Sequence, residues 1–263
     1  MELKNAVCIV TGSASGIGAA SAVMLAGKGA RVVVNYSKSE TAARATLDAC
    51  KAAGAKFGGE ALLVQADVAQ DDDCRYLAAS ALDKWGRIDA LVNNAGATKF
   101  AGHADLEALS AEDFQRIYAV NVVGAYQMVR ACAPAMKQGG RGAVVNVSSI
   151  AGKNGMGSSI AYAASKGALN TMTMSLARAL GPEIRVNAVC PGMVDTRWLR
   201  EGYGERYAAI EARYRQGTPL GRPGTPEEVA AVIAWLIEGA DLVTGEAILV
   251  DSGMHLGMMP RKA

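Results

Sequence analysis

A tyrosine and a lysine four residues apart, Tyr162 and Lys166, have the types and spacing for acid–base chemistry. On a helix this spacing places the phenol and the ammonium on one face, about one turn apart. An ammonium about 4 Å from a phenol is worth roughly 4 kcal/mol at an effective dielectric constant near 20, or about three pKa units. We therefore expect the tyrosine pKa to be lowered towards neutrality, where general acid–base catalysis is most effective.

A pair of serines precedes the tyrosine at the end of an apolar run. Val144 to Val147 has the pattern of a buried strand, and Ser148 and Ser149 follow it directly. A hydroxyl at this position can project from the edge of a sheet towards Tyr162. A phenol, an ammonium and a hydroxyl together could handle the proton of a carbonyl or an alcohol. The tyrosine–lysine spacing alone is more typical of a core tyrosine and a solvated lysine, so the surrounding elements decide its meaning.

The chain begins with an apolar strand that leads into a glycine-rich turn. The strand is Ala6–Val10, the turn Thr11–Gly18 has the pattern T-G-x-x-x-G-x-G, and an alanine-rich helix covers Ala19–Lys28. This order opens a dinucleotide-binding unit, because the glycines let the backbone approach a pyrophosphate and the helix N-terminus attracts its charge. The turn residues that we assign to cofactor binding are Gly12, Ser13, Ser15, Gly16, Ile17 and Gly18.

The second predicted strand, Arg31–Tyr36, ends where an acidic residue would bind the ribose hydroxyls of NAD. The chain reads Asn35-Tyr36-Ser37-Lys38 at this point, without a carboxylate. A 2′-phosphate would not be repelled, and Asn35, Ser37 and Lys38 could donate hydrogen bonds to it. We assign these four residues to the adenosine end of the cofactor and predict NADP(H) as preferred, with NAD possible. The alternative is that Ser37 and Lys38 begin an ordinary polar loop.

The rest of the chain alternates between apolar runs and helical patterns. Strands are predicted at 61–65, 90–92, 142–148, 185–190 and 247–250, and helices at 39–53, 71–85, 111–136, 159–180 and from 226. Seven short apolar runs separated by helices predict a doubly wound Rossmann α/β fold, with a seven-stranded parallel sheet covered by helices on both faces. Because no linker interrupts the 263 residues, we expect a single domain over residues 1–263.

Composition excludes several classes of function. The net charge is +2, and the basic residues are spread along the chain without long runs, so we expect no nucleic acid and no anionic membrane as partner. The two histidines lack metal-binding spacing and the five cysteines form no C-x-x-C pair, so we predict no metal site. Scattered cysteines, a start without a signal-peptide pattern and no long apolar run favour a cytoplasmic location.

Five motifs, in the same order along the chain, resemble those of the classical short-chain dehydrogenase/reductases. They are the glycine turn, N-N-A-G at Asn93–Gly96, Asn121 in its helix, Ser149 with Tyr162 and Lys166, and Pro191-Gly192. Within that family the chain is similar to 3-oxoacyl-[acyl-carrier-protein] reductases and to the related glucose and polyol dehydrogenases. The resemblance extends from residue 6 to about residue 253.

The resemblance implies a role for each matching side chain. Tyr162 would be the general acid in reduction and the base in oxidation, and Ser149 would hydrogen-bond the substrate oxygen. Lys166 would hold the nicotinamide ribose hydroxyls and lower the tyrosine pKa, and Asn121 would fix a water that links Lys166 to solvent. The other implied cofactor contacts are Asp67 and Val68 at the adenine, Asn94, Ala95 and Gly96 beside the adenosine, and Pro191, Gly192, Val194 and Thr196 at the nicotinamide.

A lid over the substrate is predicted at residues 193–222. Its aromatic and apolar side chains suit an acyl chain or a hydrophobic carbonyl compound better than a bare sugar, although such residues often only pack; they are Trp198, Leu199, Tyr203 and Tyr207. The tail Met254–Met259 could cap a pocket, with interface or core packing as the alternative.

Two predictions concern macromolecular partners. Lys137, Arg141 and Arg178 could form a basic patch for an acidic carrier protein, although isolated cations usually belong to solvated surface. The helices at 111–136 and 159–180 look like those that pair between subunits in family tetramers, so we expect a homotetramer.

The leading interpretation is an NADP(H)-dependent enzyme that interconverts a carbonyl and a secondary alcohol. Its substrate would be a small carbonyl compound or alcohol, possibly linked as an acyl thioester to a carrier. The enzymatic alternative is an NAD(P)-dependent glucose or polyol dehydrogenase. A non-catalytic dinucleotide sensor is a third interpretation, but a sensor would not need Asn121, Ser149, Tyr162 and Lys166.

Overall fold

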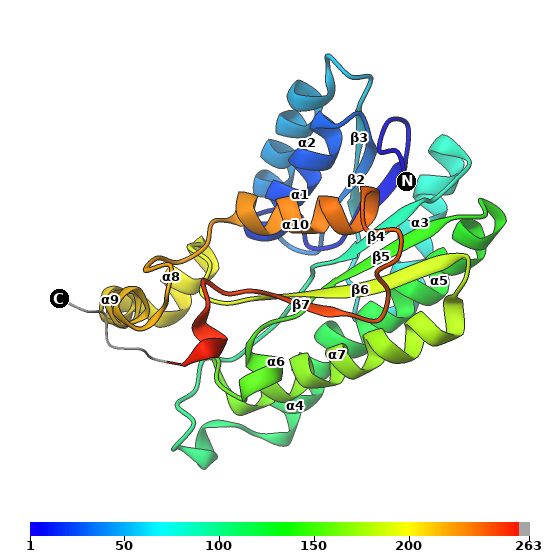
Figure 1. Ribbon diagram of the computed structural model, residues 1–263. Coiled ribbons are helices and arrows are strands. Elements are labelled where there is room, and N and C mark those ends of the chain that lie inside the picture. The colour runs from blue at the N-terminus through cyan, green and yellow to red at the C-terminus, as the bar shows by residue number, and fades with distance from the viewer. Residues whose placement is uncertain (258–263) are drawn as a thin grey trace.

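Seven parallel strands run through the centre of the molecule in the order β3-β2-β1-β4-β5-β6-β7 (Figure 1). The computed structural model describes residues 1–257. The strands are β1 (Val7–Val10), β2 (Arg31–Tyr36), β3 (Glu60–Gln65), β4 (Ala90–Asn93), β5 (Gly142–Val147), β6 (Ile184–Pro191) and β7 (Ala247–Val250). The predicted Rossmann fold, with one doubly wound sheet in a single domain, is confirmed.

Helices cover both faces of this sheet. On one side lie α1 (Gly16–Gly27), α2 (Glu40–Gly54) and α10 (Pro226–Glu238), and on the other α3 (Asp71–Trp85), α5 (Ala125–Gln138) and α7 (Ile160–Leu180) (Figure 1). Consecutive residues of β1 alternate between the two cores, Cys8 and Val10 packing in the first and Val7 and Ile9 in the second. A strand buried on both faces has to be apolar throughout, which is why these strands read as continuous apolar runs.

The strand order reverses next to β1, which pairs with β2 on one side and β4 on the other. The loops that follow β1 and β4 therefore leave the sheet in opposite directions and open a crevice at the carboxyl ends of the strands. Open α/β sheets bind their ligands at this point. The shorter helices α4 (Ala111–Tyr118), α6 (Ala151–Asn154), α8 (Arg197–Tyr203) and α9 (Tyr207–Gly217) lie towards that end of the sheet (Figure 1).

The helix predicted at 111–136 is broken in the structure. A π-helical turn, Ala119–Gly124, separates α4 from α5. Gly124 packs so closely on the loop after β3 that an added Cβ would lie 2.8 Å from the Val68 carbonyl oxygen. The wider turn also directs the Asn121 side chain inwards, where it is buried. Such turns are frequent at functional sites.

The predicted lid is two short helices joined by a 3₁₀ turn, Gly204–Arg206. Helix α8 has no buried residue, whereas α9 buries Tyr207 and Tyr214. The next helix, α10, starts as the sequence predicts, with Pro226 in its first turn and a capping box between Thr225 and Glu228. None of the helices in residues 1–257 combines the length and the apolar character needed to cross a bilayer.

Candidate active site

A cavity of about 1140 Å³ lies at the carboxyl ends of the central strands. The residues around it come from the glycine turn after β1, the segments after β2 to β6, helices α4, α7, α8 and α9, and the chain after β7. Most of the predicted site residues line this one space: Gly12, Ser15, Gly16, Ile17, Asn35, Ser37, Lys38, Asp67, Val68, Asn94, Ala95, Gly96, Ser149, Tyr162, Lys166, Pro191, Gly192, Val194 and Thr196. Four predicted residues, Ser13, Gly18, Tyr36 and Asn121, do not line it.

Hydrogen bonds join the glycine turn to the turn after β4. The side-chain amide of Asn94 donates to the carbonyl oxygens of Thr11 and Gly12 at 3.0 and 2.9 Å. Gly12 has φ +60°, and an added Cβ would lie 2.8 Å from the Cα of Ala95; one at Gly18 would lie 2.4 Å from the Asn94 amide nitrogen. Only glycine fits at either position, so the backbone stays open to the cavity.

The first turn of α1 points its amides into this opening. Ser15 is the N-cap, and its side chain accepts no hydrogen bond from the helix. The first turn also contains no acidic residue, so nothing there opposes a negatively charged ligand. Unpaired amides at the positive end of a helix dipole, with a glycine turn beside them, fit the pyrophosphate of a dinucleotide.

The adenosine end of the cavity differs from the expectation at Asn35. Its side-chain oxygen accepts from the Gly12 N–H at 2.9 Å, and its amide nitrogen donates to the Ala66 carbonyl oxygen at 3.0 Å. Both halves of the side chain are thus bound to backbone, and the prediction that Asn35 donates to a 2′-phosphate is corrected. Tyr36 is buried in the core, and Ser13 is buried against β1 and β2, where its hydroxyl donates to Val10.

The exposed residues at this end are Ser37 and Lys38. Neither side chain forms a hydrogen bond or an ion pair within residues 1–257, so both can reach a ligand. Asp67 is the one acid that borders the cavity in the described part of the chain, and one of its oxygens accepts from the Ala69 N–H at 3.0 Å. The rim beyond β2 therefore offers a cation and a hydroxyl without a competing carboxylate.

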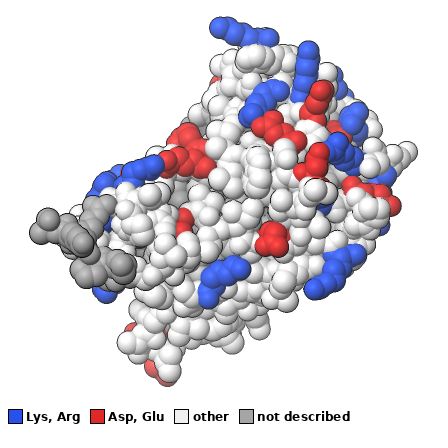
Figure 2. Space-filling model, viewed as in Figure 1, with Lys and Arg blue, Asp and Glu red and all other residues white. Residues whose placement is uncertain are grey.

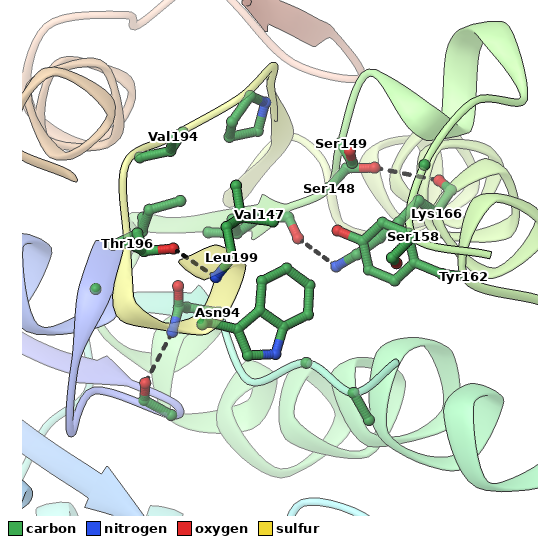
Figure 3. A pocket seen from close by; sticks show the side chains of 18 of the residues that line it. Asn94, Val147, Ser148, Ser149, Ser158, Tyr162, Lys166, Val194, Thr196 and Leu199 are labelled. Atoms are coloured by element: carbon green, nitrogen blue, oxygen red, sulfur yellow. Dashed lines mark hydrogen bonds between the residues drawn. The ribbon is translucent and has the colours of Figure 1, made fainter. Parts of the chain in front are cut away.

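Tyr162 and Lys166 lie side by side on α7, beside Ser149 from the end of β5 (Figure 3). The α7 N-cap fixes the tyrosine backbone, since the Ser159 hydroxyl accepts from the Tyr162 N–H. The Lys166 ammonium is buried, donates to the Val147 carbonyl oxygen at 2.7 Å and lies 5.6 Å from the centre of the Tyr162 ring. The predicted grouping of hydroxyl, phenol and ammonium is present.

The pKa of Tyr162 does not follow the expectation. Burial raises the pKa of Tyr162 to about 12, although the Ser149 hydroxyl acts in the lowering direction. Burial also lowers the pKa of Lys166 to about 8. The Lys166 ammonium donates its hydrogen bond to the Val147 carbonyl oxygen and not to the phenol. Burial therefore remains the main effect, and it disfavours both the phenolate of Tyr162 and the ammonium of Lys166. The tyrosine is therefore a proton-bearing phenol at neutral pH, and the prediction of a lowered pKa is wrong.

Asn121 clamps the loop after β4. Its oxygen accepts from the Ala97 N–H at 2.7 Å, and its nitrogen donates to the Ala97 carbonyl oxygen and to the Ser165 hydroxyl. An added Cβ on Gly96 would lie 3.6 Å from the Asn121 oxygen and 4.0 Å from the Lys166 nitrogen. Asn121 is thus close to Lys166 without touching it, and its role in a water-mediated relay stays a prediction.

The segment after β6 closes the cavity on its other side. Pro191 is the last residue of β6, and an added Cβ on Gly192 would lie 2.5 Å from the Tyr214 hydroxyl. Val194 forms a bridge with Gly224, and the Thr196 hydroxyl accepts from the Leu199 N–H as the N-cap of α8 (Figure 3). The lid therefore starts at a residue predicted to contact the nicotinamide.

Comparison with known proteins places this fold and this cavity in a family. The model of a protein family described as enoyl-(acyl carrier protein) reductase matches residues 12–255. The chain belongs to the short-chain dehydrogenase/reductase family. A crystal structure from Burkholderia xenovorans, described as a "putative short-chain dehydrogenase/reductase", has 42% identity and a TM-score of 0.89, and the match covers 96% of this chain and 99% of that one.

Three curated relatives of this dehydrogenase/reductase differ in what they are named for. "Granaticin polyketide synthase putative ketoacyl reductase 2" of Streptomyces violaceoruber is 45% identical, covering 95% of this chain and 96% of that protein. A 3-oxoacyl-[acyl-carrier-protein] reductase of Synechocystis is 38% identical, with coverages of 96% and 98%. Glucose 1-dehydrogenase 2 of Bacillus subtilis is 37% identical, with coverages of 97% and 96%. The family is one of NAD(P)-dependent oxidoreductases, and the names leave the substrate open.

The substrate end of this dehydrogenase/reductase contains residues that sequence reasoning missed. Trp198 was expected only as lid surface, yet its ring centre lies 6.0 Å from that of Tyr162 and 5.6 Å from that of Phe100. Ser158 lines the cavity, and its hydroxyl lies 2.7 Å from that of Thr98. Arg213 of α9 lines it too. Helical periodicity in residues 207–217 could have placed Arg213 and Tyr214 on one face of a helix. The sequence does not indicate, however, that this face borders the cavity.

The predicted basic patch of the dehydrogenase/reductase lies away from this cavity. Lys137 and Arg178 are in the last turns of α5 and α7, and Arg141 directly precedes β5 and pairs with Asp241. All three are at the amino ends of β5 and β6, whereas the cavity is at the carboxyl ends, about 20 Å along a six-residue strand. Basic and acidic side chains are interspersed over the face in Figure 2.

The remaining predictions concern cysteines, metals and the tail of the chain. All five cysteines are free and buried, and Cys190 is a core residue at the end of β6. In residues 1–257 no group of three or more His, Cys, Asp or Glu side chains is arranged to hold a metal. Of the methionine tail, Met254 lines the cavity, whereas Met258 and Met259 lie outside the described residues. The homotetramer stays a prediction.

Proposed function

We propose that this protein is an NADPH-dependent carbonyl reductase that converts a ketone with an apolar body into a secondary alcohol. The observation that carries the proposal is the joint lining of one cavity by the glycine turn, the Ser149–Tyr162–Lys166 group and an apolar, aromatic lid. When bound, the cofactor supplies hydride to the carbonyl carbon. A 3-oxoacyl thioester is the model substrate, because two of the relatives are named as ketoacyl or oxoacyl reductases.

Tyr162 is the proton donor in this proposal. Because burial raises the pKa of Tyr162 to about 12, the phenol carries its proton throughout the neutral range and can give it to the carbonyl oxygen. Ser149 borders the same space, and its hydroxyl can donate to the same oxygen and so fix its position. The hydroxyl of Ser148 is not available, since it donates to the Lys166 carbonyl oxygen at 3.1 Å.

Lys166 would change partner when a dinucleotide occupies the cavity. Its ammonium donates to the Val147 carbonyl oxygen, lies 5.6 Å from the centre of the Tyr162 ring, and would be 4.0 Å from a Cβ added at Gly96. Ribose hydroxyls at the same place would add acceptors for the ammonium, and the protonated form would then be favoured over the free amine. A protonated Lys166 beside the phenol stabilises the phenolate that remains after proton transfer. Asn121, which clamps Ala97, would hold the adjoining backbone and a relay water.

The preference for NADPH is supported by the end of β2. Lys38 is exposed, lines the cavity and has no ion-pair partner within residues 1–257, and Ser37 lies beside it. A 2′-phosphate would accept charge-assisted hydrogen bonds from both. The alternative of a sugar or polyol dehydrogenase is favoured by the relatives named L-rhamnose 1-dehydrogenase and glucose 1-dehydrogenase, but Trp198, Leu199 and Ile210 give the substrate end an apolar wall that suits an apolar chain better than a sugar.

The test follows cofactor oxidation at 340 nm with a β-ketoacyl thioester and a β-ketoester. The wild type is expected to use NADPH at a higher kcat/KM than NADH. The double variant Ser37→Asp/Lys38→Ala should reverse that preference, because a carboxylate repels the phosphate and accepts from ribose hydroxyls. Glu40→Gln on α2 is the matched control, since its carboxylate pairs with Arg44 outside the cavity. A double variant with the wild-type preference would show that the phosphate is recognised elsewhere.

A further inference from the structure

One face of the lid helix α9 borders the substrate end of the cavity. The residues of α9 that line the cavity are Ile210, Arg213, Tyr214 and Gly217. Their spacing of three and four residues puts them on one side of the helix. Three of the four suit an apolar ligand, and the fourth is a cation.

Tyr214 fixes this face relative to the rest of the site. Its side chain is buried, and its hydroxyl donates to the Asp251 carbonyl oxygen at 2.6 Å. The same hydroxyl packs directly on Gly192, which follows β6. Arg213 is the next residue on this face, and it borders the same cavity as Tyr162.

Arg213 has no partner in the described part of the chain. It forms neither a hydrogen bond nor an ion pair within residues 1–257, and its side chain is exposed at the cavity. Most other arginines of the lid are paired with an acid, namely Arg197 with Glu201, Arg200 with Asp195, Arg215 with Glu211 and Arg222 with Glu228. A cation that borders a ligand cavity while the neighbouring acids are taken is available for an anionic ligand.

The other cations around the cavity do not compete for this position. Arg116 lies 3.6 Å from Asp113, and Arg197 lies 3.5 Å from Glu201. Lys166 is buried on Val147. Lys38 is unpaired within residues 1–257 but lies at the end of β2, where the adenosine would bind.

We propose that Arg213 binds an anionic oxygen group of the substrate, a carboxylate or a phosphate, while the ketone lies at Tyr162. This inference rests on the proposed carbonyl reduction and narrows its substrate class. The lid residues that line this cavity together with Arg213 include the apolar side chains of Trp198, Leu199 and Ile210. The substrate would therefore have a ketone at one end, an apolar body and a negative charge at the other. A guanidinium recognises both anions through paired N–H groups.

The experiment compares two matched pairs of substrates. The first pair is a long-chain keto acid and its methyl ester, and the second is the 4′-phosphopantetheine and the pantetheine thioester of one β-ketoacyl group. Wild type is expected to favour the charged member of one pair by about tenfold in kcat/KM, mainly through KM. The pair that shows the preference tells whether the anion is a carboxylate or a carrier phosphate.

In wild type the preference for the charged substrate should weaken as the salt concentration rises, because salt screens the attraction between the guanidinium and the anion. The variant Arg213→Gln should reduce the preference to less than about twofold at every salt concentration. Arg206→Gln is the matched control, because Arg206 lies in the same lid, does not line the cavity and forms no ion pair within residues 1–257. It should retain the wild-type preference. Equal melting temperatures for the three proteins would show that the variants fold.

Two results would overturn the inference while leaving the proposed function in place. One is reduction of all four substrates by wild type with no preference for charge in either pair. The other is a charge preference that Arg213→Gln does not alter. Failure to reduce any of the four substrates with either cofactor would instead contradict the proposed function, and the inference with it.

Discussion

Helix α7 and the lid helices α8 and α9 contribute to the same cavity, yet they are held in very different ways. Eight residues of α7 are buried, and Gly152 of α6 packs on it so closely that an added Cβ would lie 2.5 Å from the Lys166 carbonyl carbon. Helix α8 has no buried residue, and the lid depends on a small cluster with Tyr207 and Tyr214. The reacting groups are thus fixed by the sheet, while the surface that meets the substrate can vary at little cost in stability.

The largest effect is expected from removing a hydroxyl on the fixed side. Tyr162→Phe should lower kcat by about 10² to 10⁴-fold, the range that a positioned general acid contributes. Tyr207→Phe is the matched change in the lid, where the hydroxyl donates to Asp195 at 2.8 Å without lining the cavity. Its kcat should stay within about tenfold of wild type. The comparison would break if Tyr207→Phe were the more damaging variant in steady-state assays.

A smaller effect is expected from moving the lid. An added Cβ on Gly202 of α8 would lie 2.0 Å from Cζ of Phe100, so Gly202→Ala must displace the lid or that ring. Phe100 also contacts Trp198, and Trp198 contacts Tyr162. Because a displacement of this surface alters the wall that meets the substrate, we expect the KM for the ketone to rise about tenfold, which is about 1.4 kcal/mol of binding free energy.

The dissociation constant for NADPH should change much less in Gly202→Ala, because the adenosine end does not include α8. Gly102→Ala is the control, since an added Cβ there meets nothing within 4 Å. Steady-state kinetics and fluorescence titration of NADPH would measure both quantities. An unchanged KM in Gly202→Ala would show that the lid position does not control substrate binding.

The smallest effect concerns stability and pH on the fixed side. Burial lowers the pKa of Lys166 to about 8 from 10.5, so between these values the unfolded chain binds the proton and the folded chain does not. The contribution of Lys166 to the free energy of unfolding should therefore rise with pH, by about 1 kcal/mol per pH unit above pH 8. Below pH 8 both the folded and the unfolded chain bind the proton, so the contribution of Lys166 to the free energy of unfolding should be constant and at its lowest value.

Urea unfolding of wild type and Lys166→Met at pH 7, 8 and 9 would measure this contribution as a difference. Burial raises the pKa values of buried cysteines, for example Cys74 to about 11, and this acts in the opposite sense above about pH 9. Both proteins contain these cysteines, so the difference removes them. A difference independent of pH from 7 to 9 would mean that Lys166 is protonated in the folded state.

The sequence predicted the fixed side well because each of its signals is local. The four-residue spacing of Tyr162 and Lys166, the glycine turn and the run of Val residues before Ser149 each report a short-range geometry. Asn35 was misjudged because a residue at the end of a strand can turn inwards, and here it holds the Gly12 N–H. The pKa of Tyr162 was misjudged because charge attraction was considered without burial.

The lid could be predicted only in outline. Its aromatic content was visible, but the faces of α8 and α9 depend on packing against Phe100, Asp251 and the segment after β6. Those contacts are distant in sequence, so no periodic pattern reports them. The position of Arg213 at the cavity is likewise set by these contacts and by no local pattern in the sequence.

The most direct test of the account is a crystal structure of the protein with bound NADPH. The account predicts a nicotinamide ring beside Tyr162, with the Lys166 ammonium moved from the Val147 carbonyl to the ribose hydroxyls, and Lys38 at the 2′-phosphate. A structure in which the nicotinamide lies away from Ser149 and Tyr162, with Lys166 still on Val147, would contradict it.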